Sequence, residues 1–175
     1  MFKPVLRYFA FAVSIALLLV VLKAVNWVPG VVEEGLLKPY ASLDEVKQKL
    51  HVREVYVPSY FPQRLRWPPA RILAQSKPHV AVAMEFVDRE KGDVALMISQ
   101  STSADLVPDR KLEIREIRQT LPYRLQGRDA VLQVGTCNDG DTCSRISWGE
   151  GTYRMLVAMR SVPSDLLLIV HSMIE

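Results

Sequence analysis

The stretch that decides the fold runs from residue 79 to residue 101 and reads HVAVAMEFVDREKGDVALMISQS. Every second residue is apolar in both of its halves: Val80, Val82, Met84 and Phe86, then Val94, Leu96 and Ile98. A repeat of two is the side-chain repeat of a β-strand. A charged turn that contains Gly92 separates the halves. The stretch therefore predicts an antiparallel hairpin.

The same alternation continues toward the C-terminus. In KLEIREIRQ (111–119) Leu112 and Ile114 share a face, whereas Ile117 breaks the register, which indicates a bulge or a strand end. A turn at Gly127 then leads into the segment around the two cysteines. Further alternating apolar residues follow on either side of a turn at 149–151: Ile146 and Trp148, then Tyr153, Met155, Val157 and Met159. These segments predict an antiparallel β meander of about six strands.

A helical signal lies on each side of the meander. Ser42 and Glu45 form a capping-box pattern ahead of three apolar residues with helical spacing: Leu43, Val46 and Leu50. In residues 161–175 Ser161 or Ser164 is a candidate cap and Pro163 suits a first turn. A buried stripe is expected at Leu166, Leu167, Val170 and Met173 or Ile174. Two helices that flank a meander most simply cover one of its faces, which predicts an α+β domain.

The segment between the first helix and the hairpin is less regular. VREVYVP (52–58) is typical of a strand. Three prolines, Pro62, Pro68 and Pro69, then predict an extended, turn-rich segment.

An apolar run from Tyr8 to Val28 has only Lys23 and Asn26 as strongly polar interruptions. About 20 such residues span a bilayer as a helix, and the Pro and Gly at 29 and 30 would end it. The predicted organisation is a cytoplasmic N-terminus (1–7), a transmembrane anchor (8–28), a linker (29–41) and an extracytoplasmic domain (42–175).

Orientation follows from the flanking charges. Lys3 and Arg7 precede the apolar run without an acid, whereas Glu33 and Glu34 follow it. The positive-inside rule then places the N-terminus in the cytoplasm and the C-terminal domain in the periplasm or outside the cell. A cleaved secretory signal is the alternative. Both interpretations export the domain.

Both cysteines lie in CNDGDTC (137–143), and export favours a disulfide between them. Their spacing differs from the Cys-x-x-Cys of redox enzymes. Asn138, Asp139 and Asp141 offer oxygen ligands, but their spacing matches no EF-hand. We therefore expect a Cys137–Cys143 disulfide that ties a hairpin across its loop, and no metal or cofactor.

Composition and motifs argue against several function classes. The chain has 175 residues and a formal net charge of +3, with its charges spread evenly, so a nucleic-acid partner is not expected. HExxH, GxSxG, P-loop and dinucleotide-binding motifs are missing from the sequence. We predict no catalytic residue. An envelope enzyme, hydrolase-like, with a site assembled from dispersed residues remains an alternative, as does an accessory subunit of a membrane complex.

Aromatic residues and arginines interleave in YVPSYFPQRLRWPPAR (56–71). Both types are enriched at binding hot spots, and both suit lipid headgroups. The predicted binding surface comprises Tyr60, Phe61, Arg64, Arg66, Trp67 and Arg71. Its partner would be an envelope protein or a lipid. The alternative is that the aromatic rings pack on the sheet while the arginines lie in water.

Four stretches resemble a bacterial extracytoplasmic domain family of unknown function, over roughly residues 45 to 175. They are YVPSYFP, LMISQS, LQGRDAVLQ and ISWGEGTYRMLVAMRSVPSDLLLIVHSMI. Members of that family are often fused through one transmembrane helix to cytoplasmic anti-sigma segments. The resemblance implies an α+β fold outside the membrane and no catalytic residues. Only about seven residues precede the predicted anchor here, too few for an anti-sigma segment.

Overall fold

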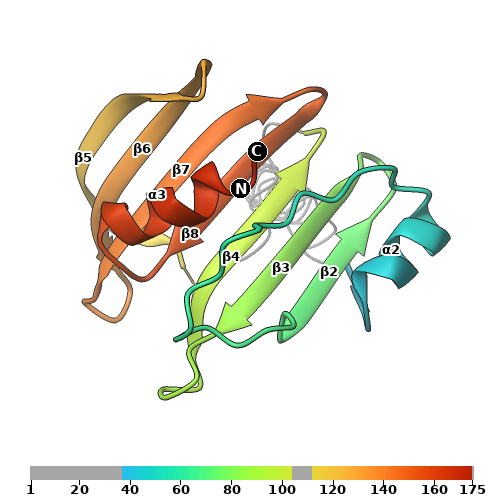
Figure 1. The fold of residues 1–175 in the computed structure, drawn as a ribbon, viewed down its shortest axis with the longest axis horizontal. Helices are drawn as coiled ribbons and strands as arrows, with labels where there is room; N and C mark the ends of the chain where they lie inside the picture. Colours follow the sequence, from blue (N-terminus) through green and yellow to red (C-terminus); the bar gives the residue numbers. More distant parts are fainter. Residues whose placement is uncertain (1–36, 104–111, 175) are drawn as a thin grey trace, which may run out of the picture. The chain divides into compact units, whose positions relative to one another are not determined.

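One antiparallel sheet of eight strands organises the residues that the computed structural model describes, 37–103 and 112–174 (Figure 1). The strands are β1 (Lys38–Tyr40), β2 (Arg71–Gln75), β3 (Ala81–Val87), β4 (Val94–Ser101), β5 (Ile114–Leu125), β6 (Arg128–Cys137), β7 (Thr142–Glu150) and β8 (Tyr153–Met159). The helices are α2 (Leu43–Leu50) and α3 (Pro163–His171). The antiparallel α+β architecture predicted from the sequence is thus confirmed, with more strands than predicted.

The strand order is β1-β2-β3-β4-β8-β7-β6-β5. Two four-stranded meanders are therefore joined where β4 pairs with β8. The prediction of a single continuous meander is wrong at this junction, because the chain leaves β4 in the middle of the sheet and re-enters at the far edge as β5. Alternating apolar residues identify strands, and short turns identify hairpins, but neither specifies which strand lies next to β4.

The predicted hairpin details are confirmed. β3 and β4 pair across the charged turn, with a register shift at Phe86. β5 has register shifts on both sides of Ile117, which is the bulge that the broken alternation indicates, and the strand then continues to Leu125. Gln126 and Gly127 both have positive φ, 47° and 87°, as a two-residue hairpin turn requires.

Two short strands were not predicted, and one predicted strand is absent. β2 has the buried, non-alternating sequence RILAQ, and β1 lies inside the range 29–41 predicted as a linker. Residues 52–58 are not a strand: the side chain of Gln100 instead accepts from Tyr56 N at 2.9 Å and donates to Glu54 O at 2.7 Å. The Gln100 side chain thus makes the two hydrogen bonds that the backbone of a neighbouring strand would otherwise make.

The main core lies on one face of the sheet, here called the front face. Directly opposed residues of six strands form one buried row across it: Leu132, Ile146, Val157, Ile98, Met84 and Ile72. α3 packs over β7 and β8, and residues 51–70 cross β3 and β4 on the same face (Figure 1). α2 lies against β1 and β2 and adds Val46 to this core. Both helices therefore cover one face, as predicted.

The two helices begin differently. The Ser42 hydroxyl accepts from Glu45 N at 3.2 Å, and the Glu45 carboxylate accepts from Ala41 N at 2.8 Å, so the capping box forms with its second bond one residue earlier than usual. α3 starts at Pro163 without a side-chain cap. The predicted serine cap is wrong because Ser161 donates to Val162 O at 3.1 Å instead.

Within the described ranges, the structure contains no helix long and apolar enough to cross a membrane. The predicted anchor at 8–28 and the N-terminus at 1–7 lie outside those ranges.

Both edges of the sheet carry a proline. Pro39 lies in β1 and Pro122 lies in β5, each within a paired register. A proline has no N–H to donate, so these residues weaken both edges as templates for an added strand.

Gly135 of β6 provides a test of the packing against β5. A Cβ at this position would overlap Glu116 O and lie 2.5 Å from Ile114 Cγ2, whereas a Cβ at Gly149 would meet nothing within 4 Å. We expect Gly135→Ala to lower the free energy of unfolding by about 1–3 kcal/mol because a backbone carbonyl has to move. Urea denaturation measures this change in the free energy of unfolding. Gly149→Ala is the control, and equal effects of the two substitutions would contradict the β5–β6 register.

Candidate functional site

Three aromatic rings form a cluster at the front face. Phe86, fully buried on β3, packs against Phe61 at a centroid distance of 4.9 Å and stacks with Trp67 at 5.9 Å. Phe61 and Trp67 meet edge to face at 5.6 Å. Trp67 nevertheless keeps 50% of its surface exposed. The cluster therefore holds a large, half-exposed ring in a fixed position.

The predicted arginines do not all lie beside this cluster. Arg64 and Arg66 lie between Phe61 and Trp67 in the sequence, and both are exposed. Arg71 lies directly opposite Glu85 in the β2–β3 register and forms an ion pair with it at 3.5 Å. Because Glu85 precedes Phe86 in a strand, Arg71 lies on the other face of the sheet. The structure thus separates Arg71 from the other residues of the predicted surface.

Residues 59–64 run alongside α3 in the opposite direction. Ser59 donates from its amide and its hydroxyl to Ser172 O, at 3.2 and 3.0 Å. At the other end, Arg64 pairs with Asp165 at 3.4 Å. Leu168, which lies between these two contacts on α3, is 57% exposed, and Tyr60 is 47% exposed. Leu168 was missed because the third of three consecutive leucines in a helical apolar run does not stand out in the sequence.

We call Tyr60, Arg64, Arg66, Trp67 and Leu168 the aromatic surface. It combines two exposed rings, one exposed leucine and two guanidinium groups. The ion pair of Arg64 with Asp165 is solvent-exposed, so it contributes little stability and leaves the guanidinium accessible.

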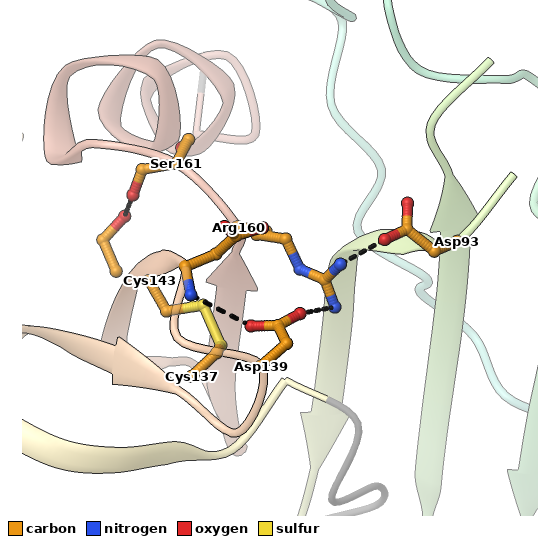
Figure 2. Close-up of a disulfide and its surroundings, with 8 residues drawn as sticks. Asp93, Cys137, Asp139, Cys143, Arg160 and Ser161 are labelled. Atoms are coloured by element: carbon orange, nitrogen blue, oxygen red, sulfur yellow. Dashed lines mark hydrogen bonds and ion pairs between the residues drawn. A yellow bond between two sulfur atoms is a disulfide. The ribbon is translucent and has the colours of Figure 1, made fainter. Parts of the chain in front are cut away.

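The structure contains the predicted disulfide between Cys137 and Cys143. Their Cα atoms are 5.6 Å apart, and both side chains are buried. The loop that they close is not free in solvent, because Asp139 accepts from Asp141 N at 3.2 Å and from Arg160 at 2.8 Å (Figure 2). The disulfide therefore fixes a loop that is itself bound to the end of β8.

Arg160 connects three turns at this end of the sheet. Its guanidinium pairs with Asp93, at the end of the β3–β4 turn, and with Asp139 in the disulfide loop (Figure 2). Its backbone N donates to Ala95 O at 2.8 Å, next to the β4–β8 junction. We call Asp93, Asp139 and Arg160 the junction cluster, since it joins the two meanders.

A cavity of about 200 Å³ lies beside the junction cluster. The described residues that line it are Arg64, Asp88, Lys91, Asp93, Ala95, Asp141, Thr142 and Arg160. Asp88 is already engaged: its carboxylate accepts from Glu90 N and Lys91 N, and these bonds lower its pKa below the usual value. Cations and carboxylates thus line the cavity together.

The histidines form no catalytic pair in the described part of the chain. Nε2 of His171 lies 3.0 Å from the Tyr123 hydroxyl. His51 ends α2 in a left-handed conformation, and His79 precedes β3. No hydrogen bond or ion pair joins any of the three to a carboxylate within residues 37–103 and 112–174.

Comparisons with protein-family models, with curated proteins and with solved structures found no match. The resemblance to the extracytoplasmic family stays a prediction.

The junction cluster should contribute to stability. Replacing Arg160 with Met leaves two aspartates at the junction without their cationic partner, and we expect a loss of about 1–3 kcal/mol in the free energy of unfolding. Thermal and urea denaturation measure this loss. Arg124→Met is the matched control, because the Arg124–Asp129 ion pair is largely exposed. An unchanged stability in the Arg160 variant would contradict the role of the cluster.

The disulfide closes a short loop, so its removal should cost about 2 kcal/mol in the chain-entropy model. The double variant Cys137→Ser/Cys143→Ser should melt at a lower temperature and retain the circular dichroism of the folded sheet. Finding both thiols free in protein purified from the envelope would refute the disulfide.

Proposed function

We propose that this chain is a membrane-anchored, extracytoplasmic interaction module that binds an envelope protein through the aromatic surface. The apolar segment 8–28 would tether it, with its N-terminus in the cytoplasm. The proposal assigns no chemical reaction to the chain.

The half-exposed Trp67 is the observation that carries the proposal. Its ring stacks on the buried Phe86, yet half of its surface remains exposed. The stack thus fixes the ring and leaves apolar surface in water that a partner could cover. A rigid, partly exposed tryptophan next to arginine is the residue combination that dominates binding hot spots. Because Trp67 is already held in place, little side-chain entropy is lost on binding.

The sequences of the two edge strands favour a partner that binds to this face over one that adds a strand to the sheet. Pro39 and Pro122 disfavour the addition of a strand at either edge. The aromatic surface instead presents side chains from an irregular segment and from α3, which suits a partner that docks against side chains.

Crosslinking and pull-down of the full chain from native membranes tests the proposal. The test variant, Arg66→Glu/Leu168→Asp, changes two exposed side chains and leaves the ring cluster intact. The control, Arg53→Glu/Val131→Asp, changes an exposed arginine and a 44%-exposed valine outside the aromatic surface.

We expect a protein partner that is recovered with the wild type and the control and is reduced at least tenfold with the test variant. Equal melting temperatures of the variants show that the fold is retained. Recovery of the same proteins with both variants would refute the aromatic surface as the contact.

A further inference from the structure

Two segments line the cavity beside the junction cluster, and we call them its two walls. One wall consists of Arg64 and Lys91, which the chain brings together because Arg89 N donates to Arg64 O at 2.8 Å. The other wall is Asp141 with Thr142, which the disulfide loop positions. The first wall thus carries two cations beside Asp88 and Asp93, and the second carries one carboxylate.

One charged group on each wall is available, whereas Arg64 pairs with Asp165. In the described part of the chain, the Lys91 ammonium and the Asp141 carboxylate have no ion-pair partner. Asp88, in contrast, is occupied by two backbone amides, so it adds little to recognition. As far as residues 37–103 and 112–174 are concerned, a ligand would therefore meet an unpaired ammonium on one wall and an unpaired carboxylate on the other.

Two residues that line the cavity carry buried polar atoms that lack a hydrogen-bond partner within the described ranges. Arg160 Nε and Asp93 Oδ1 are both buried and have no hydrogen-bond partner among the described residues, although the rest of the junction cluster is paired. Unpaired buried polar atoms are rare because each one costs free energy. A polar ligand that reaches these two atoms could supply an acceptor for Arg160 Nε and a donor for Asp93 Oδ1.

We propose that this cavity binds a small zwitterion of the amino-acid class. Its carboxylate would lie between Lys91 and Arg64, and its ammonium group would lie at Asp141. The volume of about 200 Å³ corresponds to roughly seven water-sized groups, which is enough for a short amino acid.

Binding at this position has a structural consequence. The ligand would connect the β3–β4 turn to the disulfide loop, as the ion pairs of Arg160 already do. Arg64 also belongs to the aromatic surface, so a ligand in the cavity would fix the position of the Arg64 side chain within that surface. This inference goes beyond the proposed function, which does not depend on it.

Titration of the full chain in lipid nanodiscs with ω-amino acids tests the inference. The probes are glycine, β-alanine, 4-aminobutanoate and 6-aminohexanoate, at constant ionic strength, with acetate and ethylammonium as singly charged references. Calorimetry measures binding. We expect at least one zwitterion to bind at least tenfold more tightly than either reference. No preference for any zwitterion would overturn the inference.

Two surface variants locate the binding site. Lys91→Met and Asp141→Asn should each weaken binding of the preferred zwitterion at least threefold, because each removes one of its two charge partners. Lys47→Met, at an exposed position of α2, is the control. Unchanged affinity in either test variant would show that the zwitterion binds elsewhere and would overturn the assignment. Neither variant alters the residues of the aromatic surface.

Discussion

The pairing of β4 with β8 is the constraint on which the rest of the structure depends. It converts two separate meanders into one sheet and aligns their apolar rows, so that Ile98 lies opposite Val157 in the middle of the core. α3 packs on β7 and β8, and residues 51–70 cross β3 and β4, so the two covering segments rest on different meanders (Figure 1). The aromatic surface exists only because these two covering segments lie side by side along residues 59–64.

Local features of the fold could be predicted from the sequence, and long-range features could not. Alternation and turn residues identified the hairpin of residues 79–101, and the break at Ile117 identified a bulge. The position of β8 beside β4 depends on contacts about 60 residues apart, which no local pattern encodes. The strand predicted at 52–58 fails because the Gln100 side chain takes the place of a neighbouring strand.

The candidate sites show the same division. The disulfide followed from the predicted export and from the spacing of the two cysteines, and the aromatic residues from composition. Arg71 was grouped with Trp67 because they are close in sequence, but the intervening chain carries it to the opposite face of the sheet. The junction cluster was not predicted, since Asp93, Asp139 and Arg160 come from three separate turns and only the β4–β8 pairing brings them together.

The most direct test of this account is an NMR measurement of proton–proton contacts across β4 in the full chain in nanodiscs. The account predicts cross-strand contacts between Gln100 and Met155 and between Ile98 and Val157, which are opposed in the β4–β8 register. Contacts from β4 to β5 instead would describe a single continuous meander. That result would contradict the joined sheet, the junction cluster and the cavity beside it.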